Sequence, residues 1–117
     1  LKQIYLNKRP TTSSLLPPER RITDRYDWEY IFKSKENIFE TIDIQEVETI
    51  SLDKAVEKFD LPNPDFIKID VQGLSYEVLE GGKNIVNDSV LGIEIEVEFL
   101  ESYKGQKTFG YIVSIFR

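Results

Sequence analysis

The segment Phe66–Val71, FIKIDV, restricts the fold of this 117-residue chain more than any other feature. Its bulky apolar residues form a near-continuous run, which is typical of a strand buried on both faces of a parallel sheet. Gly73 then permits a tight turn, and apolar residues at helical spacing follow it. The segment therefore predicts a βα unit of an α/β sheet, in which ligands bind beyond the carboxyl ends of the parallel strands.

Helix and strand signals on both sides of this unit support an α/β fold. Ser51 has the form of an N-cap, and Leu52–Phe59 places apolar residues on one face of a short helix. Gly81 and Gly82 are expected to break the helix after Gly73 into two pieces. Val90–Phe99 alternates apolar residues with glutamates and is the clearest strand, and 109–116 is expected to be a helix or an irregular apolar segment.

The first half of the chain indicates an extension made of strands and loops. Leu1–Asn7 alternates weakly and suits a short strand, whereas the prolines and Ser/Thr run of Lys8–Arg25 favour a loop. Tyr26–Phe32 fits a short helix or a strand. Phe39–Ile50 is rich in β-branched residues and predicts one extended strand with a bulge. We therefore divide a single domain into a strand and loop extension, 1–50, and a set of βα units, 51–117.

The composition excludes several kinds of chemistry. The chain has no histidine and no cysteine, so it cannot build a Ser-His-Asp triad, a thiolate nucleophile or a sulfur-based zinc site. Its net charge of −6 argues against nucleic acid and anionic membranes as general partners. No apolar run is long enough to span a membrane, so we expect a cytoplasmic protein. A local basic cluster still suits an anion: Lys8, Arg9, Arg20, Arg21 and Arg25.

Asp70 is the best placed candidate for chemistry, since it stands at the end of a strand before a glycine turn. There a carboxylate orients a hydroxyl, accepts a proton or holds a metal, and the alternative is a helix-capping role. Lys68 shares its strand face, about 7 Å away at Cα. A lysine in a buried strand needs a partner, and Glu94 or Glu96 on the later strand is the natural one.

Other polar residues near this strand have a functional and a structural interpretation. The amide of Gln72 suits an uncharged substrate group but equally suits a solvated turn. Glu77 faces either the sheet end or, as is commoner for glutamate, water. Ser13 and Ser14 lack a histidine to activate them, so hydrogen bonding in a turn is the better interpretation.

Three glutamates share one face of the expected strand Val90–Phe99. Glu94, Glu96 and Glu98 would suit Mg²⁺ or Ca²⁺, yet like charges on a strand face more often mean a solvated face or one paired with lysine. We therefore predict no metal site.

Four blocks of the chain resemble S-adenosylmethionine-dependent methyltransferases of the FkbM family. Residues 65–82, DFIKIDVQGLSYEVLEGG, are similar to the family's FLKIDVEG strand and EVLKGA helix. IYLNKRPTTSSLLPP resembles its strand and Ser-Leu loop, VETISLDKAV its TLDD step, and GIEIEVEFLESYKGQKTF its acidic strand and Tyr-x-Gly-Gln turn. The blocks occur in the family's order, which is more specific than any one of them. Gln72 and Ser75 depart from the family, because many members carry acidic residues there.

The resemblance implies a Rossmann-like class I methyltransferase sheet that is incomplete in this chain. The cofactor-binding strands of the family lie before the position of Leu1, so 1–117 is expected to be the substrate-side half and inactive alone. The implied cofactor is S-adenosylmethionine, and the implied reaction is O-methylation of a sugar or polyketide hydroxyl on a small-molecule or glycan acceptor.

The resemblance also implies roles for particular residues. Asp70 is the candidate catalytic carboxylate beside the transferred methyl group. Lys68, Gln72 and Glu96 are expected to support substrate binding, and Ser14 to border the way into the substrate site.

Two other functions fit the sequence. One is a non-catalytic binding module with a methyltransferase-like sheet that presents Arg20, Arg21 and aromatic residues to a partner. The other is a Mg²⁺-dependent hydrolase that uses Asp70 and Glu96.

Overall fold

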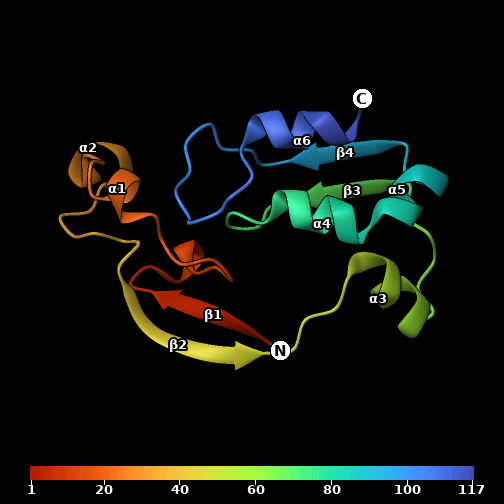
Figure 1. Ribbon diagram of the computed structural model, residues 1–117, viewed down its shortest axis with the longest axis horizontal. Helices are drawn as coiled ribbons and strands as arrows, with labels where there is room; N and C mark the ends of the chain where they lie inside the picture. Colours follow the sequence, from red (N-terminus) through yellow and green to blue (C-terminus); the bar gives the residue numbers. More distant parts are fainter.

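Two separate two-stranded sheets organise the computed structural model, which describes residues 1–117 (Figure 1). Strands β1 (Lys2–Asn7) and β2 (Thr41–Val47) pair antiparallel, and strands β3 (Phe66–Ile69) and β4 (Gly92–Ile95) pair parallel. The helices are η1 (Pro10–Thr12), α1 (Arg20–Thr23), α2 (Trp28–Phe32), α3 (Leu52–Lys58), α4 (Ser75–Gly81), α5 (Lys83–Asp88) and α6 (Phe109–Ile115). The chain is thus a mixed α/β protein, as predicted.

The first half of the chain contains the two expected strands, β1 and β2. It also shows the structure of Tyr26–Phe32, for which the sequence allowed either a helix or a strand. The register between β1 and β2 shifts after Leu6. Leu6 faces Asp43, but the next residue, Asn7, faces Thr41, so Ile42 has no partner on β1. This is the predicted bulge. Tyr26–Phe32 contains helix α2, because the Asp27 side chain accepts a hydrogen bond from the Tyr30 N–H and caps the first turn of the helix.

The second half contains the predicted βα unit. Gly73 has φ +80° in the turn between β3 and α4, a conformation that favours glycine. Gly82 separates α4 from α5, and a Cβ there would lie 2.8 Å from Cδ2 of Leu52, so the glycine lets α3 approach closely. Asp53 of α3 accepts hydrogen bonds from the N–H groups of Asn84 and Ile85, both at 3.1 Å, and thereby caps α5.

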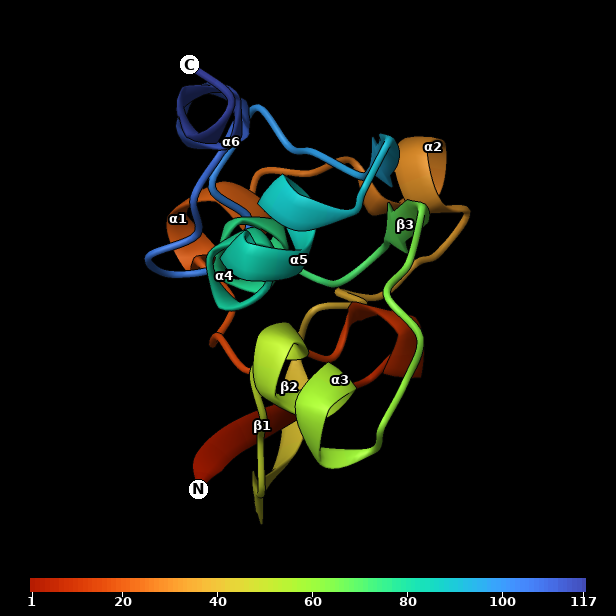
Figure 2. The same ribbon diagram turned by 90° about the vertical axis from the view of Figure 1, so that its right-hand side faces the viewer.

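The prediction that β3 is buried on both faces is wrong. Helices α4, α5 and α6 all lie on one side of the β3–β4 pair (Figure 2), where Ile69, Leu79 and Ile112 form an aliphatic core. The other face carries Phe66, which is 59% exposed, and Lys68. Both strands are also shorter than expected, because the chain leaves the sheet after Ile69 and Ile95 to build the turns beyond them.

A second core lies in the other half of the molecule and is mainly aromatic. Its buried members are Ile38, Phe39 and Tyr103, with Leu16, Tyr26, Trp28 and Phe32 packed around them. The radius of gyration is 15.7 Å, whereas a compact domain of this length is expected near about 13 Å. The two small cores therefore lie side by side along an elongated molecule rather than merging.

Tyr103 joins the two halves. It is fully buried, and its ring packs 5.6 Å from that of Phe39. Its hydroxyl donates toward the Thr12 carbonyl oxygen at 2.7 Å and toward Oε1 of Gln72 at 3.0 Å. The ring also fills the space above Gly73, where an added Cβ would lie 2.8 Å from Tyr103 Cδ2.

We predict that Gly73→Ala destabilises the protein more than Gly105→Ala. Gly105 has φ +76° and no heavy atom near its Cβ position, so its substitution costs only backbone strain, about 1 kcal/mol. Gly73→Ala adds a clash with Tyr103 and should cost about 2–4 kcal/mol in total. Urea unfolding of the two variants measures the difference, and equal losses would mean that the Tyr103 ring moves aside freely.

Candidate functional site

The carboxyl ends of β3 and β4 bring acidic side chains together. Asp70 directly follows β3 and Glu96 directly follows β4, and Ile69 pairs with Ile95 in the parallel register. The Glu96 N–H donates to the Ile69 carbonyl oxygen at 2.9 Å, which continues the ladder by one step. The sheet thus places the two carboxylates next to each other at the edge where α/β proteins bind ligands.

Asp70 does not have the helix-capping role that was its structural alternative. The N-cap of α4 is Leu74, and no side chain accepts a hydrogen bond from the first turn of that helix. Asp70 is exposed instead. Its neighbour is Glu96, whose pKa is raised by a hydrogen bond with Asp70, by partial burial and by repulsion between the two charges. Glu96 therefore retains a proton more readily than an isolated glutamate would.

Glu98 is a third carboxylate in this region, and it is more buried than Asp70 and Glu96. Burial, together with the charge of Glu96, raises the pKa of Glu98 to about 7. The amide nitrogen of Gln106 donates to Oε2 of Glu98 and acts in the opposite direction. The amide is turned this way because its oxygen accepts hydrogen bonds from the N–H groups of Ser102 and Tyr103, at 2.9 and 3.2 Å. Glu98 is thus a fixed carboxylate that gains or loses a proton near neutral pH.

The turn after Asp70 is tied to the first half of the chain. Ser14 is buried, and its hydroxyl donates to the Gln72 carbonyl oxygen at 2.6 Å while accepting a hydrogen bond from the Leu16 N–H. The side-chain oxygen of Gln72 accepts from Tyr103, which leaves its amide nitrogen free to donate to a ligand. Ser14 therefore positions the Gln72 turn, and its own hydroxyl is already engaged.

Lys68 and Glu77 lie beside the strand-end carboxylates rather than among them. Lys68 pairs with Glu94 at 3.0 Å, one of the two partners predicted, although both side chains are more than 60% exposed. Glu77, in the first turn of α4, is half-buried, and its Oε2 is buried without a hydrogen-bond partner. The structure thus brings Asp70 and Glu96 together, places Gln72 in the turn that follows Asp70, and leaves Lys68 on the open sheet face.

A comparison with known protein families identifies the family of this chain. The family model described as Methyltransferase FkbM domain matches residues 7–117. This chain belongs to the FkbM methyltransferase family. No curated protein and no solved structure matches it.

The glycines that follow β3 and end α4 in this FkbM domain are not open to a nucleotide cofactor. Gly73 is the glycine between a parallel strand and its helix, but Tyr103 occupies the space above it. A Cβ added at Gly81 would lie 3.2 Å from Cβ of Ser51, and one added at Gly82 would lie 2.8 Å from Cδ2 of Leu52. Side chains of the domain itself therefore fill the room that a cofactor phosphate or ribose would need.

Two further features bound the chemistry of this FkbM domain. No group of three or more Asp or Glu side chains is arranged to hold a metal ion. No helix combines the length and apolar character that crossing a bilayer requires.

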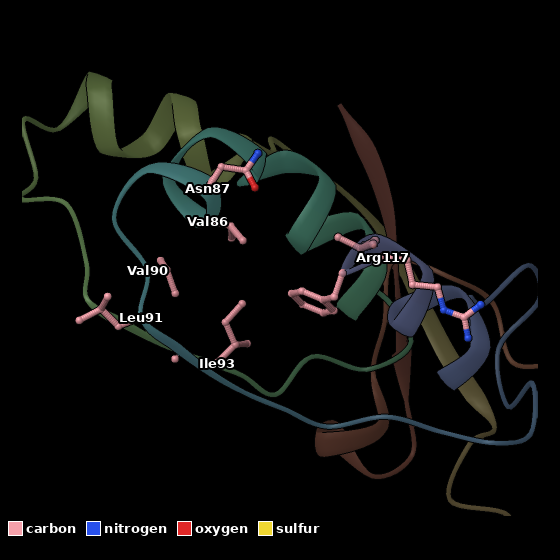
Figure 3. A pocket seen from close by; sticks show the side chains of 9 residues that line it. Val86, Asn87, Val90, Leu91, Ile93 and Arg117 are labelled. Atoms are coloured by element: carbon pink, nitrogen blue, oxygen red, sulfur yellow. The ribbon is translucent and has the colours of Figure 1, made fainter.

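A large apolar hollow lies away from the carboxylates, at the beginning of β4. Its volume is about 610 Å³, and Val86, Val90, Leu91 and Ile93 line it together with Arg117 (Figure 3). It lacks acidic side chains, so the strand-end site is the better candidate for proton transfer.

The sequence analysis did not single out Glu98, Tyr103 or Gln106 as site residues. The pattern of Val90–Phe99 treated its three glutamates as equivalent, because alternation defines a face but not the depth of burial. The Tyr-x-Gly-Gln turn was recognised only as a family block, although it supplies both Tyr103 and Gln106.

We predict that Glu98→Gln stabilises the protein at high pH and has little effect at low pH. A carboxyl with a raised folded-state pKa is favourable when protonated, so its contribution to stability is fully present below about pH 4.5 and is lost as pH rises through about 7. Urea unfolding at pH 8 should show a gain of about 1–2 kcal/mol for the variant, reduced from the full linkage value by solvent screening. A gain that is the same at pH 4.5 and pH 8 would contradict the raised pKa.

Proposed function

We propose that this domain is the acceptor side of an S-adenosylmethionine-dependent O-methyltransferase. The observation that carries the proposal is the group of carboxylates at the carboxyl ends of β3 and β4, in a chain of the FkbM family. Asp70 is exposed and free of backbone hydrogen bonds, and Glu96 lies within hydrogen-bond reach of it. Such a group suits a substrate that must be oriented and must lose a proton.

The acceptor needs a partner that fixes its reacting hydroxyl and a donor for a neighbouring oxygen, and the residues present can supply both. Asp70 would accept the hydrogen bond of the hydroxyl and thereby fix its oxygen. The free amide nitrogen of Gln72 would donate to a neighbouring oxygen of the acceptor. Positioning of this kind contributes strongly to transfer reactions, and proton acceptance by Asp70 adds to it.

The proposed acceptor is a sugar or a polyketide that carries hydroxyl groups. Adjacent hydroxyls match an arrangement of carboxylates beside an amide, because carboxylates accept hydrogen bonds and the amide donates one. Glu96 would accept from a second hydroxyl. Lys68 lies on the same strand face as Asp70, two residues earlier, and would interact with parts of the acceptor that extend along the open face.

The proposal assigns S-adenosylmethionine binding to residues outside 1–117. The glycines next to the β3–α4 unit support this assignment, because neighbouring side chains occupy the space above Gly73, Gly81 and Gly82. It also treats the β3–β4 pair as part of a larger Rossmann-like sheet, which is supported by its parallel pairing and by the uncovered face with Phe66. No comparable structural observation favours the two other functions that fit the sequence, a magnesium-dependent hydrolase and a non-catalytic binding module.

We predict that Asp70→Asn lowers methyl transfer by the full-length protein at least about 100-fold, the usual range for a lost proton acceptor. The measurement is transfer of labelled methyl from S-adenosylmethionine to a panel of sugars and hydroxylated polyketides. Asp88→Asn is the matched control, since Asp88 is exposed on α5 and should leave the rate unchanged. Unchanged transfer by Asp70→Asn would reduce Asp70 to a structural role.

A further inference from the structure

A second pocket lies between the β1–β2 strand pair and α1. Its volume is about 600 Å³, within the range of about 300–1,000 Å³ typical of small-molecule sites. Figure 1 shows the strand pair and α1 in the same half of the molecule. Pro17, Pro18 and Phe39 supply apolar walls. None of the carboxylates proposed to bind the methyl acceptor lines this pocket.

Two cations line the pocket and have unused hydrogen-bond donors. Arg20 pairs through Nε with Asp24 at 3.4 Å, and its two terminal nitrogens make no ion pair or hydrogen bond within the chain. Lys104, from the turn after Tyr103, forms no salt bridge. An anion in the pocket would therefore meet an arginine and a lysine that are not fully neutralised.

The acidic residue of the pocket wall shares its cation with a second carboxylate. Glu40 lines the pocket, and the ammonium group of Lys8 lies 3.1 Å from its Oε2 and 3.0 Å from Oε2 of Glu36. Asp24 also holds Asn37, whose amide nitrogen donates to it at 3.2 Å. One carboxylate thus fixes Arg20 and Asn37 on the same side of the pocket. Arg20 and Lys104 therefore supply the local positive charge for an anion, although the chain as a whole is acidic.

Thr23 is the independent observation that points to a ligand. It is fully buried, it belongs to the pocket wall, and its hydroxyl has no hydrogen-bond partner. Only one other buried side-chain polar atom in the chain lacks a partner, Oε2 of Glu77. Buried hydroxyls are normally paired, so an unpaired one beside a pocket marks a hydrogen-bonding capacity that the free protein leaves unused.

We propose that this pocket binds a small organic molecule through its phosphate group. Arginine, lysine and a hydroxyl form the donor set that phosphate oxygens prefer, and an arginine fork can bind two of them at once. The proline and phenylalanine walls would contact the apolar part of the ligand. The site is separate from the proposed methyl-acceptor site, so neither proposal depends on the other.

The test uses phenyl phosphate as the probe, followed by amide chemical shifts of the full-length protein. Saturable shifts are expected at Thr23, Arg20 and Lys104. Phenol tests whether the anion is needed, and benzoate tests whether a carboxylate serves equally well. No saturable shift at millimolar phenyl phosphate would overturn the proposal, and equal binding of benzoate or phenol would overturn the assignment to phosphate.

Arg20 and Arg21 provide a matched pair of variants. Arg21 is the next residue, but it pairs with Glu19 at 3.0 Å and does not line this pocket. Arg20→Ala and Lys104→Ala should each weaken phenyl phosphate binding at least fivefold, whereas Arg21→Ala should change it less than twofold. Equal weakening by all of them would mean a diffuse charge effect and would contradict a built site.

Thr23→Val separates a ligand contact from a structural role. Valine has the shape of threonine without its hydroxyl, and that hydroxyl makes no bond in the free protein. We expect the melting temperature without ligand to stay the same or to rise, while phenyl phosphate binding weakens several-fold. Unaltered binding by a folded Thr23→Val variant would remove Thr23 from the site.

Discussion

The buried side chain of Tyr103 is the contact on which the rest of this structure depends. The chain forms two small cores, one aromatic and one aliphatic, and neither is large enough to organise the whole molecule. Tyr103 packs in the first core, fills the space above Gly73, and reaches with its hydroxyl to both Thr12 and Gln72. A fully buried tyrosine combines a large apolar contact with one polar bond, so it can fix two elements relative to each other.

The candidate site inherits its geometry from that contact. Tyr103 holds Gln72 in the turn after Asp70, and Gln106, from the same turn as Tyr103, holds Glu98. Asp70 and Glu96 are placed by the parallel pairing of β3 and β4. The pair remains open to solvent while Glu98 is half-buried, so the pKa of Glu98 is raised mainly by burial and that of Glu96 mainly by its hydrogen bond with Asp70.

Local patterns predicted most of the elements but not their surroundings. The strand beginning at Phe66, the cap at Ser51, the break at Gly82 and the turn at Gly105 follow from side-chain chemistry and backbone freedom, which act over a few residues. The burial of β3 did not follow, because an apolar run is compatible with one covered face or two, and the helices cover one. The polar role of Ser14 was also predictable only as turn chemistry, since its partner Gln72 lies 58 residues away in the sequence.

The sequence by itself determined the family, the α/β class and the position of Asp70 at a strand end, because the FIKIDV strand, its glycine turn and the order of the four blocks are properties of consecutive residues. The tertiary structure decided which of these residues meet. Burial and desolvation depend on atoms brought from distant segments, so only folding could distinguish Glu98 from Glu94 and Glu96, fill the turn at Gly73 with Tyr103, and leave the Thr23 hydroxyl unpaired in a basic pocket.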